Sequence, residues 1–126
     1  RYLLHLELDC TLSIPLRSLT LKSLRLHLRG EAVANPLLEA LCANSECLAL
    51  TSTDRHEKPL EENWVPLRSD SIHQWGFSRE DALLPFGPRS FSGYQLLQEF
   101  FTLPEKFSFV QIDDLGIAIQ SQTGNR

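Results

Sequence analysis

The chain has 126 residues, of which 42% are hydrophobic and 22% charged, and its formal net charge is −4. This length is enough for one domain with its own hydrophobic core. The composition excludes a disordered chain, a collagen-like chain and a coiled coil. No apolar run approaches the roughly 18 residues of a membrane span, and the negative charge argues against binding to a nucleic-acid backbone. We therefore expect neither a nucleic-acid partner nor direct membrane insertion.

The start of the chain predicts an internal segment of a larger protein. The sequence contains no methionine, and a strand-like alternation begins at once. Over residues 2–10, apolar side chains alternate with His5, Glu7 and Asp9. A period of two predicts a half-buried strand. We expect a single internal domain over residues 1–126.

The three cysteines are Cys10, Cys42 and Cys47. An odd number in a chain of this size favours reduced thiols over a disulfide framework, which indicates a cytosolic compartment. A structural zinc ion needs four ligands at tight spacing, and these residues do not supply them. We expect no metal.

The first half predicts strands and one helix. Residues 24–29 repeat the alternation with a basic outer face, so they are expected to pair with residues 2–10, whose outer face is acidic. Residues 32–44 carry an apolar stripe at helical spacing, with Pro36 in the first turn. Residues 46–51 are predicted as a third strand.

A charged segment separates the two halves of the sequence. Residues 52–63 contain seven charged or histidine side chains and are predicted to be a solvated, mobile loop. Residues 64–67 are predicted as a short edge strand, because Pro66 cannot donate a hydrogen bond to a central ladder. Ten of the eleven aromatic residues lie at or beyond Trp64. The second half must therefore pack its aromatic side chains on the first half or on a partner.

The second half predicts a helix at 92–103. Ser92 is predicted to be its N-cap, with Gln95 completing a capping box. Phe91 and Leu96 are expected to form a hydrophobic staple across this cap. One half of the helix is apolar, and the opposite arc carries glutamine, glutamate and threonine. Ser78 and Asp81 form a second capping box, for a short helical turn at 79–84.

The chain ends in further strands by the same analysis. Residues 107–112 are partly apolar on both faces, which predicts a central strand. A turn is expected at 113–116 and another strand at 117–120. Together these elements predict an α+β fold, with a mixed, largely antiparallel β-sheet and about two main helices packed on it.

The titratable residues predict no catalytic site. None of the four histidines lies in a known nucleophile motif. Adjacent carboxylates such as Asp113 and Asp114 diverge in direction and do not form a catalytic dyad. Gly87 and Gly93 do not make a phosphate-binding loop. We expect no enzyme activity and no cofactor.

One loop does not fit a role in the core alone. Residues 85–91 are rich in proline and aromatic residues and directly precede the second helix. Arg89 lies between apolar groups in this loop. It is expected either to pack locally against backbone carbonyls or to anchor a protein interface, where arginine and aromatic residues concentrate.

The run from Gly76 to Leu115, GFSREDALLPFGPRSFSGYQLLQEFFTLPEKFSFVQIDDL, resembles the TssF family, also called VasA or ImpG. These proteins are baseplate subunits of the bacterial type VI secretion system. The strand–helix unit from Leu24 to Leu41 resembles the same family, whereas residues 52–74 match it poorly. Pro36 and Phe86 depart from the residues expected there.

The resemblance implies a structural role in a wedge complex with TssG, a second TssF copy, TssK and TssE. It places the protein in the bacterial cytoplasm, at a baseplate docked to the inner-membrane complex, where it supports sheath and tube assembly and effector delivery. It implies no catalysis. The candidate interface or structural residues are Phe86, Arg89, Phe91, Tyr94, Leu97, Phe101, Pro104 and Lys106.

Two other functions are compatible with the residues. The first is a small ligand-binding module, for instance for a carbohydrate, with an aromatic pocket that uses Trp64 and Trp75. The second is a folding module that only provides spacing within a longer chain.

Overall fold

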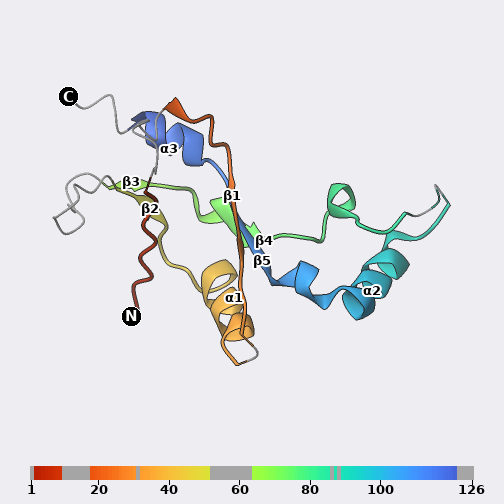
Figure 1. The fold of residues 1–126 in the computed structure, drawn as a ribbon. Helices are drawn as coiled ribbons and strands as arrows, with labels where there is room; N and C mark the ends of the chain where they lie inside the picture. Colours follow the sequence, from red (N-terminus) through yellow and green to blue (C-terminus); the bar gives the residue numbers. More distant parts are fainter. Residues whose placement is uncertain are drawn as a thin grey trace.

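The computed structural model describes residues 2–9, 18–30, 32–51, 64–85, 87 and 89–121 (Figure 1). Within these residues the chain forms three α-helices, one three-stranded antiparallel sheet and one two-stranded antiparallel sheet. The predicted α+β class is therefore confirmed. The loop predicted at 52–63, Cys10 and the candidate residue Phe86 lie outside the described residues.

The larger sheet has β5 (Phe109–Ile112) between β1 (Leu24–His27) and β4 (Ile72–Gln74). The prediction of a central strand near 107–112 is thus confirmed, while β4 was not predicted. Leu24 and Ile72 both lie opposite Ile112 in the two ladders. These three apolar residues therefore meet across the sheet and fix its register.

The predicted first strand is absent from its expected place. Residues 2–9 are exposed and carry no strand, and β1 pairs with β5. The predicted pairing of residues 2–10 with 24–29, which would place Glu7 or Asp9 across from Arg25 or Arg29, is wrong. Strand β1 pairs with β5 instead, and the Arg25 guanidinium donates to Gln111 Oε1 at 3.0 Å. Alternating apolar and polar side chains make a segment suitable for a strand. The segment becomes part of a sheet only where a neighbouring strand pairs with its backbone N–H and C=O groups.

The smaller sheet joins β2 (Ala49–Leu50) to β3 (Val65–Pro66). Both lie within the segments predicted as strands. The Leu67 N–H donates to the Leu48 carbonyl at 2.8 Å, which continues the pairing by one step. Pro66 is tolerated because both strands of this two-stranded sheet are edge strands, so the missing N–H of proline need not belong to a central ladder.

Helix α1 (Ala34–Cys42) confirms the first predicted helix, with Pro36 in its first turn. It packs against β4. Helix α3 (Leu115–Ser121) replaces the strand predicted at 117–120, so that prediction is wrong. Leu115, Ala118 and Ile119 are buried, and their spacing of three and four residues places them on one helical face.

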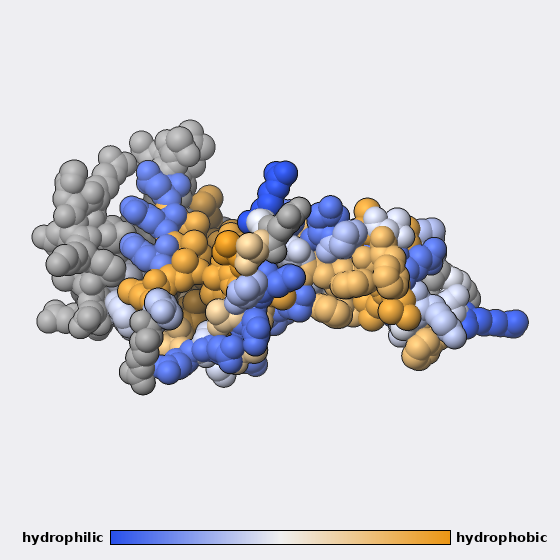
Figure 2. All heavy atoms as spheres, turned by 90° about the horizontal axis from the view of Figure 1, so that it is seen from below, coloured by the Kyte–Doolittle hydropathy of each residue, from blue (hydrophilic) through white to orange (hydrophobic). Residues whose placement is uncertain are grey.

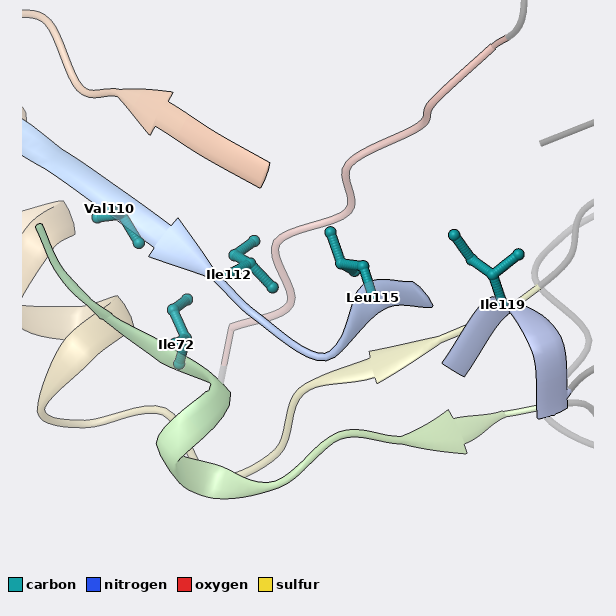
Figure 3. Packing of buried hydrophobic residues seen from close by; sticks show 5 residues of the cluster. All are labelled: Ile72, Val110, Ile112, Leu115 and Ile119. Carbon is teal, nitrogen blue, oxygen red and sulfur yellow. The ribbon is translucent and has the colours of Figure 1, made fainter. Parts of the chain in front are cut away.

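The core runs from the larger sheet to α3. Figure 3 shows Ile72, Val110, Ile112, Leu115 and Ile119 along this line, contributed by β4, β5 and α3. Partly buried leucines of β1 and α1 pack around them. These buried side chains hold the scaffold together by removing apolar surface from water.

Helix α2 (Ser92–Thr102) lies to one side of the larger sheet in Figure 1. It packs against η5 (Pro104–Ser108), the short helix that leads into β5. The chain reaches α2 from β4 through η4 (Arg79–Asp81), which contains the capping box predicted for Ser78 and Asp81. Helix α2 is thus connected to the sheet at both ends without lying on it.

Candidate functional site

Helix α2 turns two of its polar side chains inward, whereas Gln98 and Thr102 are exposed. Gln95 and Glu99 are buried, with 7% and 0% of their surface exposed. Tyr94 and Phe101 on the apolar side are 74% and 80% exposed. A helix at the edge of a core ordinarily does the opposite. The local contacts of Glu99 explain the inversion.

The Glu99 carboxylate collects hydrogen bonds from both neighbouring segments. The backbone N–H groups of Leu83 and Leu84 each donate to Glu99 Oε1 at 2.8 Å. The Gln95 amide donates to the same oxygen at 3.2 Å and to the Leu84 carbonyl at 3.0 Å. Lys106 Nζ donates to Glu99 Oε2 in a buried ion pair. We call these five residues the Glu99 cluster.

The Glu99 cluster corrects the predicted start of α2. The N-cap position is Phe91, one residue before the predicted Ser92, and it makes no side-chain capping bond. Gln95 does not complete a capping box, because its amide is used on Leu84 and Glu99. The tertiary hydrogen bonds outcompete the local cap in satisfying this side chain.

Burial and hydrogen bonding act in opposite directions on Glu99. Burial alone would raise the pKa of this carboxyl, because it penalises the charged form. The Leu84 N–H, the Lys106 ammonium and the Leu83 N–H outweigh this penalty and lower the pKa of Glu99 to about 2. The carboxylate is therefore ionised at neutral pH.

Gly76 makes room for the Lys106 side chain. Its φ of +109° is unfavourable for residues with a Cβ. A Cβ at Gly76 would lie 3.2 Å from the Lys106 carbonyl oxygen and 3.4 Å from its Cγ and Cε. The Asp81 carboxylate accepts the Gly76 N–H at 3.2 Å and the Ser78 N–H at 3.3 Å. The turn at Gly76 therefore leaves space for the aliphatic part of the Lys106 side chain, because no Cβ projects there.

The apolar side of α2 is exposed to solvent. We call Tyr94, Leu97, Phe100 and Phe101 the α2 outer face, and between 52% and 80% of the surface of each is exposed. Phe91, which is 70% exposed, contacts Tyr94 edge to face, with ring centroids 5.9 Å apart. Figure 2 shows hydrophobic surface over the end of the molecule that carries α2. Large exposed apolar patches of this kind mark interaction surfaces.

The structure brings together most of the candidate residues named from the sequence. Arg89, Phe91 and Pro104 are exposed near the two ends of α2, and Tyr94, Leu97 and Phe101 lie on the α2 outer face. Lys106 differs from them, because it is 4% exposed and its ammonium is used within the chain.

Sequence reasoning missed the buried roles of Glu99 and Gln95. It placed both on the polar arc of the helix and predicted that Gln95 completes a capping box. A signal was present in their spacing, since residues i and i+4 lie one above the other on a helix. A lone lysine seven residues after Glu99 supplies the countercharge. The two backbone donors of Leu83 and Leu84 have no signature in the sequence, since every residue except proline carries an N–H.

The two tryptophans do not form a shared pocket. An open groove of about 290 Å³ is lined by Trp75, with Arg25 and Phe109 among its neighbours, but not by Trp64. The Arg25 guanidinium lies 3.9 Å from the centre of the Trp75 ring and covers it. The aromatic carbohydrate pocket proposed as an alternative thus receives no support.

The described residues show no other built site. Among them, no group of three histidine, cysteine, aspartate or glutamate side chains is placed to hold a metal ion. No helix in this part of the chain is long and apolar enough to cross a membrane. Cys42 and Cys47 are free thiols, and burial raises the pKa of Cys42.

The fold and this site define a small α+β domain with an exposed aromatic helix face held on a buried ion pair. Known proteins are similar to this chain in sequence and in fold. The profile of the family described as "Type VI secretion system, TssF" matches residues 1–126. The chain therefore belongs to the TssF family of the type VI secretion system.

Two relatives show how far the similarity extends. The chain is 39% identical to type VI secretion system component TssF1 of Pseudomonas aeruginosa over 120 residues, which cover 93% of this chain and 18% of that protein. It is also similar, with a TM-score of 0.58 and 34% identity, to a chain in the cryo-electron microscopy structure of the TssK-TssF-TssG baseplate subcomplex. That match covers 76% of this chain and 17% of the other. The chain thus spans less than a fifth of the length of these relatives.

Proposed function

We propose that this chain is a structural, non-catalytic part of a type VI secretion baseplate subunit. Family membership over residues 1–126 and 34% identity to a chain in a TssK-TssF-TssG subcomplex support this role. The baseplate would lie in the bacterial cytoplasm, docked to the inner-membrane complex. There the parent protein would assemble with TssG, a second TssF copy, TssK and TssE, and support sheath and tube assembly and effector delivery.

The single observation in the structure that carries this role is the exposed α2 outer face. Tyr94, Leu97, Phe100 and Phe101 expose more than half of their surface each. Leaving them in water forgoes about 1.5–3 kcal/mol for each large apolar side chain. Aromatic residues and arginine are enriched at protein interfaces, and Arg89 and Phe91 lie at the start of this helix. The face is therefore best explained as a surface that a neighbour covers in the assembled baseplate.

The sheet, α1 and α3 serve as the scaffold in this proposal. They hold the buried core, whereas α2 lies beside the sheet (Figure 1). The aromatic residues of the α2 outer face are exposed. We take TssG as the neighbour that covers the α2 outer face; the second TssF copy and another part of the parent chain are the alternatives. In each case the scaffold fixes where the α2 outer face is presented.

The test compares assembly with folding. The double substitution Arg89→Ala with Phe91→Ala should reduce the yield of parent protein co-purified with TssG several-fold. It should leave the melting temperature nearly unchanged, because both side chains are exposed. The matched control is Arg29→Ala with Val33→Ala, an exposed arginine and an exposed apolar residue near α1. A full yield of complex together with a lowered melting temperature would overturn the proposal.

A further inference from the structure

The orientation of α2 is the least expected feature of the molecule. The hydrophobic effect favours turning Tyr94, Leu97 and Phe101 inward, yet the structure buries a glutamate and a lysine. A buried ion pair is often no more stabilising than an apolar pair of similar volume. Gross stability therefore does not explain why charge is buried here.

We infer that Glu99 is a positioning residue that fixes which face of α2 points outward. This inference rests on the proposed function, because it concerns how the assembly surface is presented. Glu99 is anchored on both sides of its own helix in sequence. Leu83 and Leu84 precede α2, and Lys106 in η5 follows it.

The geometry of the Glu99 cluster allows only one rotation of the helix. Three donors converge on Glu99 Oε1 and the lysine reaches Oε2. Turning α2 about its axis would carry this carboxylate away from Leu83, Leu84 and Lys106 together. All buried side-chain polar atoms among the described residues have partners as the helix stands. A rotated helix would leave the buried Lys106 ammonium and the part-buried N–H groups of Leu83 and Leu84 without their acceptor, which is unfavourable.

A carboxylate is needed at this position, and an amide replaces it only in part. In Glu99→Gln the side-chain oxygen can still accept from Leu83 and Leu84, but the amide nitrogen then faces the Lys106 ammonium, donor against donor. In Glu99→Leu every hydrogen bond that the Glu99 carboxylate accepts is lost. The two variants therefore form a graded series.

The experiment uses the full-length parent protein and two measurements. Hydrogen exchange reports the amides of Leu83 and Leu84 directly, and co-purification with TssG reports the assembly surface. Glu99→Leu should speed exchange at these two amides at least tenfold, Glu99→Gln less, while the amide of Val110 in β5 stays protected. Co-purification with TssG should fall in the same order. Glu105→Leu, the same substitution on an exposed carboxylate of η5, should change neither.

Each outcome decides a separate point. Unchanged exchange at Leu83 and Leu84 in Glu99→Leu would overturn the positioning role. Faster exchange with undiminished co-purification would show that Glu99 orients α2 for some purpose other than TssG assembly, which also overturns the inference as stated. If the unmodified parent protein fails to co-purify with TssG, the proposed function fails. The exchange data would still show whether Glu99 holds the helix.

Discussion

Glu99 is ionised although it is fully buried, because the amides of Leu83 and Leu84 and the ammonium of Lys106 lower its pKa to about 2. A carboxyl whose pKa is lowered by folding stabilises the folded chain above its ordinary pKa of about 4.5. That contribution is lost progressively as the pH falls from about 4.5 toward 2. The ion pair of the Glu99 cluster should therefore weaken in acid.

Comparison of the wild-type chain with Glu99→Gln tests whether the ionised carboxylate of Glu99 stabilises the fold. At neutral pH the substitution should lower the free energy of unfolding by about 3–5 kcal/mol, the typical cost of breaking a buried ion pair. The difference should shrink between pH 4.5 and pH 2, because the wild-type carboxyl is then becoming neutral as well. Urea unfolding at several pH values measures it. A difference that stays constant down to pH 2 would show that the carboxylate charge is not what matters.

Gly76 gives a second prediction at the residue scale. Gly76→Ala should destabilise the chain by about 1–3 kcal/mol, since alanine at a φ of +109° is strained and its Cβ would press on Lys106. Gly87→Ala is the matched control. A Cβ at Gly87 would lie 3.9 Å from Ser90 Oγ, an ordinary contact, and its φ is not in the left-handed region. Thermal unfolding of both variants checks the prediction, and equal melting temperatures would contradict it.

At the scale of elements, shortening a side chain should destabilise the fold when the side chain lies in β5 and should leave stability nearly unchanged when it lies on the α2 outer face. Ile112 is 6% exposed at the centre of the larger sheet, so Ile112→Ala should cost about 2–5 kcal/mol. Phe101 is 80% exposed on α2, so Phe101→Ala should change stability by less than about 0.5 kcal/mol. Chemical denaturation of the two variants tests this contrast. A large loss of stability in Phe101→Ala would mean that the α2 outer face packs within the chain.

The elements also show where sequence patterns suffice. Helix α1 was predicted because its apolar stripe has helical spacing. The central strand β5 was predicted because its residues are partly apolar on both faces. The helix at 115–121 was missed because residues 117–120 alone fit a strand period, while the buried Leu115 lies outside that window. Residues 2–9 alternate as a strand should, but no strand among the described residues pairs with them. Pairing partners are a tertiary property that the segment itself does not encode.

The sequence predicted which loop and helix form the candidate site, but it did not predict which side of that helix faces inward. The loop before α2 and the aromatic residues of the helix were identified from composition and spacing. The side of α2 that faces inward was not, because periodicity assigns the apolar side to the core. The reversal depends on two backbone N–H groups and one distant lysine that converge on Glu99. Such convergence is visible only when the chain is folded.

At the scale of the whole molecule, one part of the chain forms the hydrophobic core and another carries the exposed aromatic residues. The sheets with α1 and α3 enclose the core, and α2 lies beside them (Figure 1). The Glu99 cluster holds α2 there, and the aromatic residues of the α2 outer face are exposed. The chain spans 18% of the length of its P. aeruginosa relative. The central claim is that the α2 outer face is an assembly surface of the baseplate.

The most direct test is co-purification of the full-length parent protein with tagged TssG, with and without substitutions on the α2 outer face. Leu97→Gln with Phe101→Gln removes apolar surface from exposed positions and leaves the Glu99 cluster intact. We predict that the unmodified protein is retained and that the folded variant is lost. Retention of both would contradict the claim and reduce this helix to part of the scaffold.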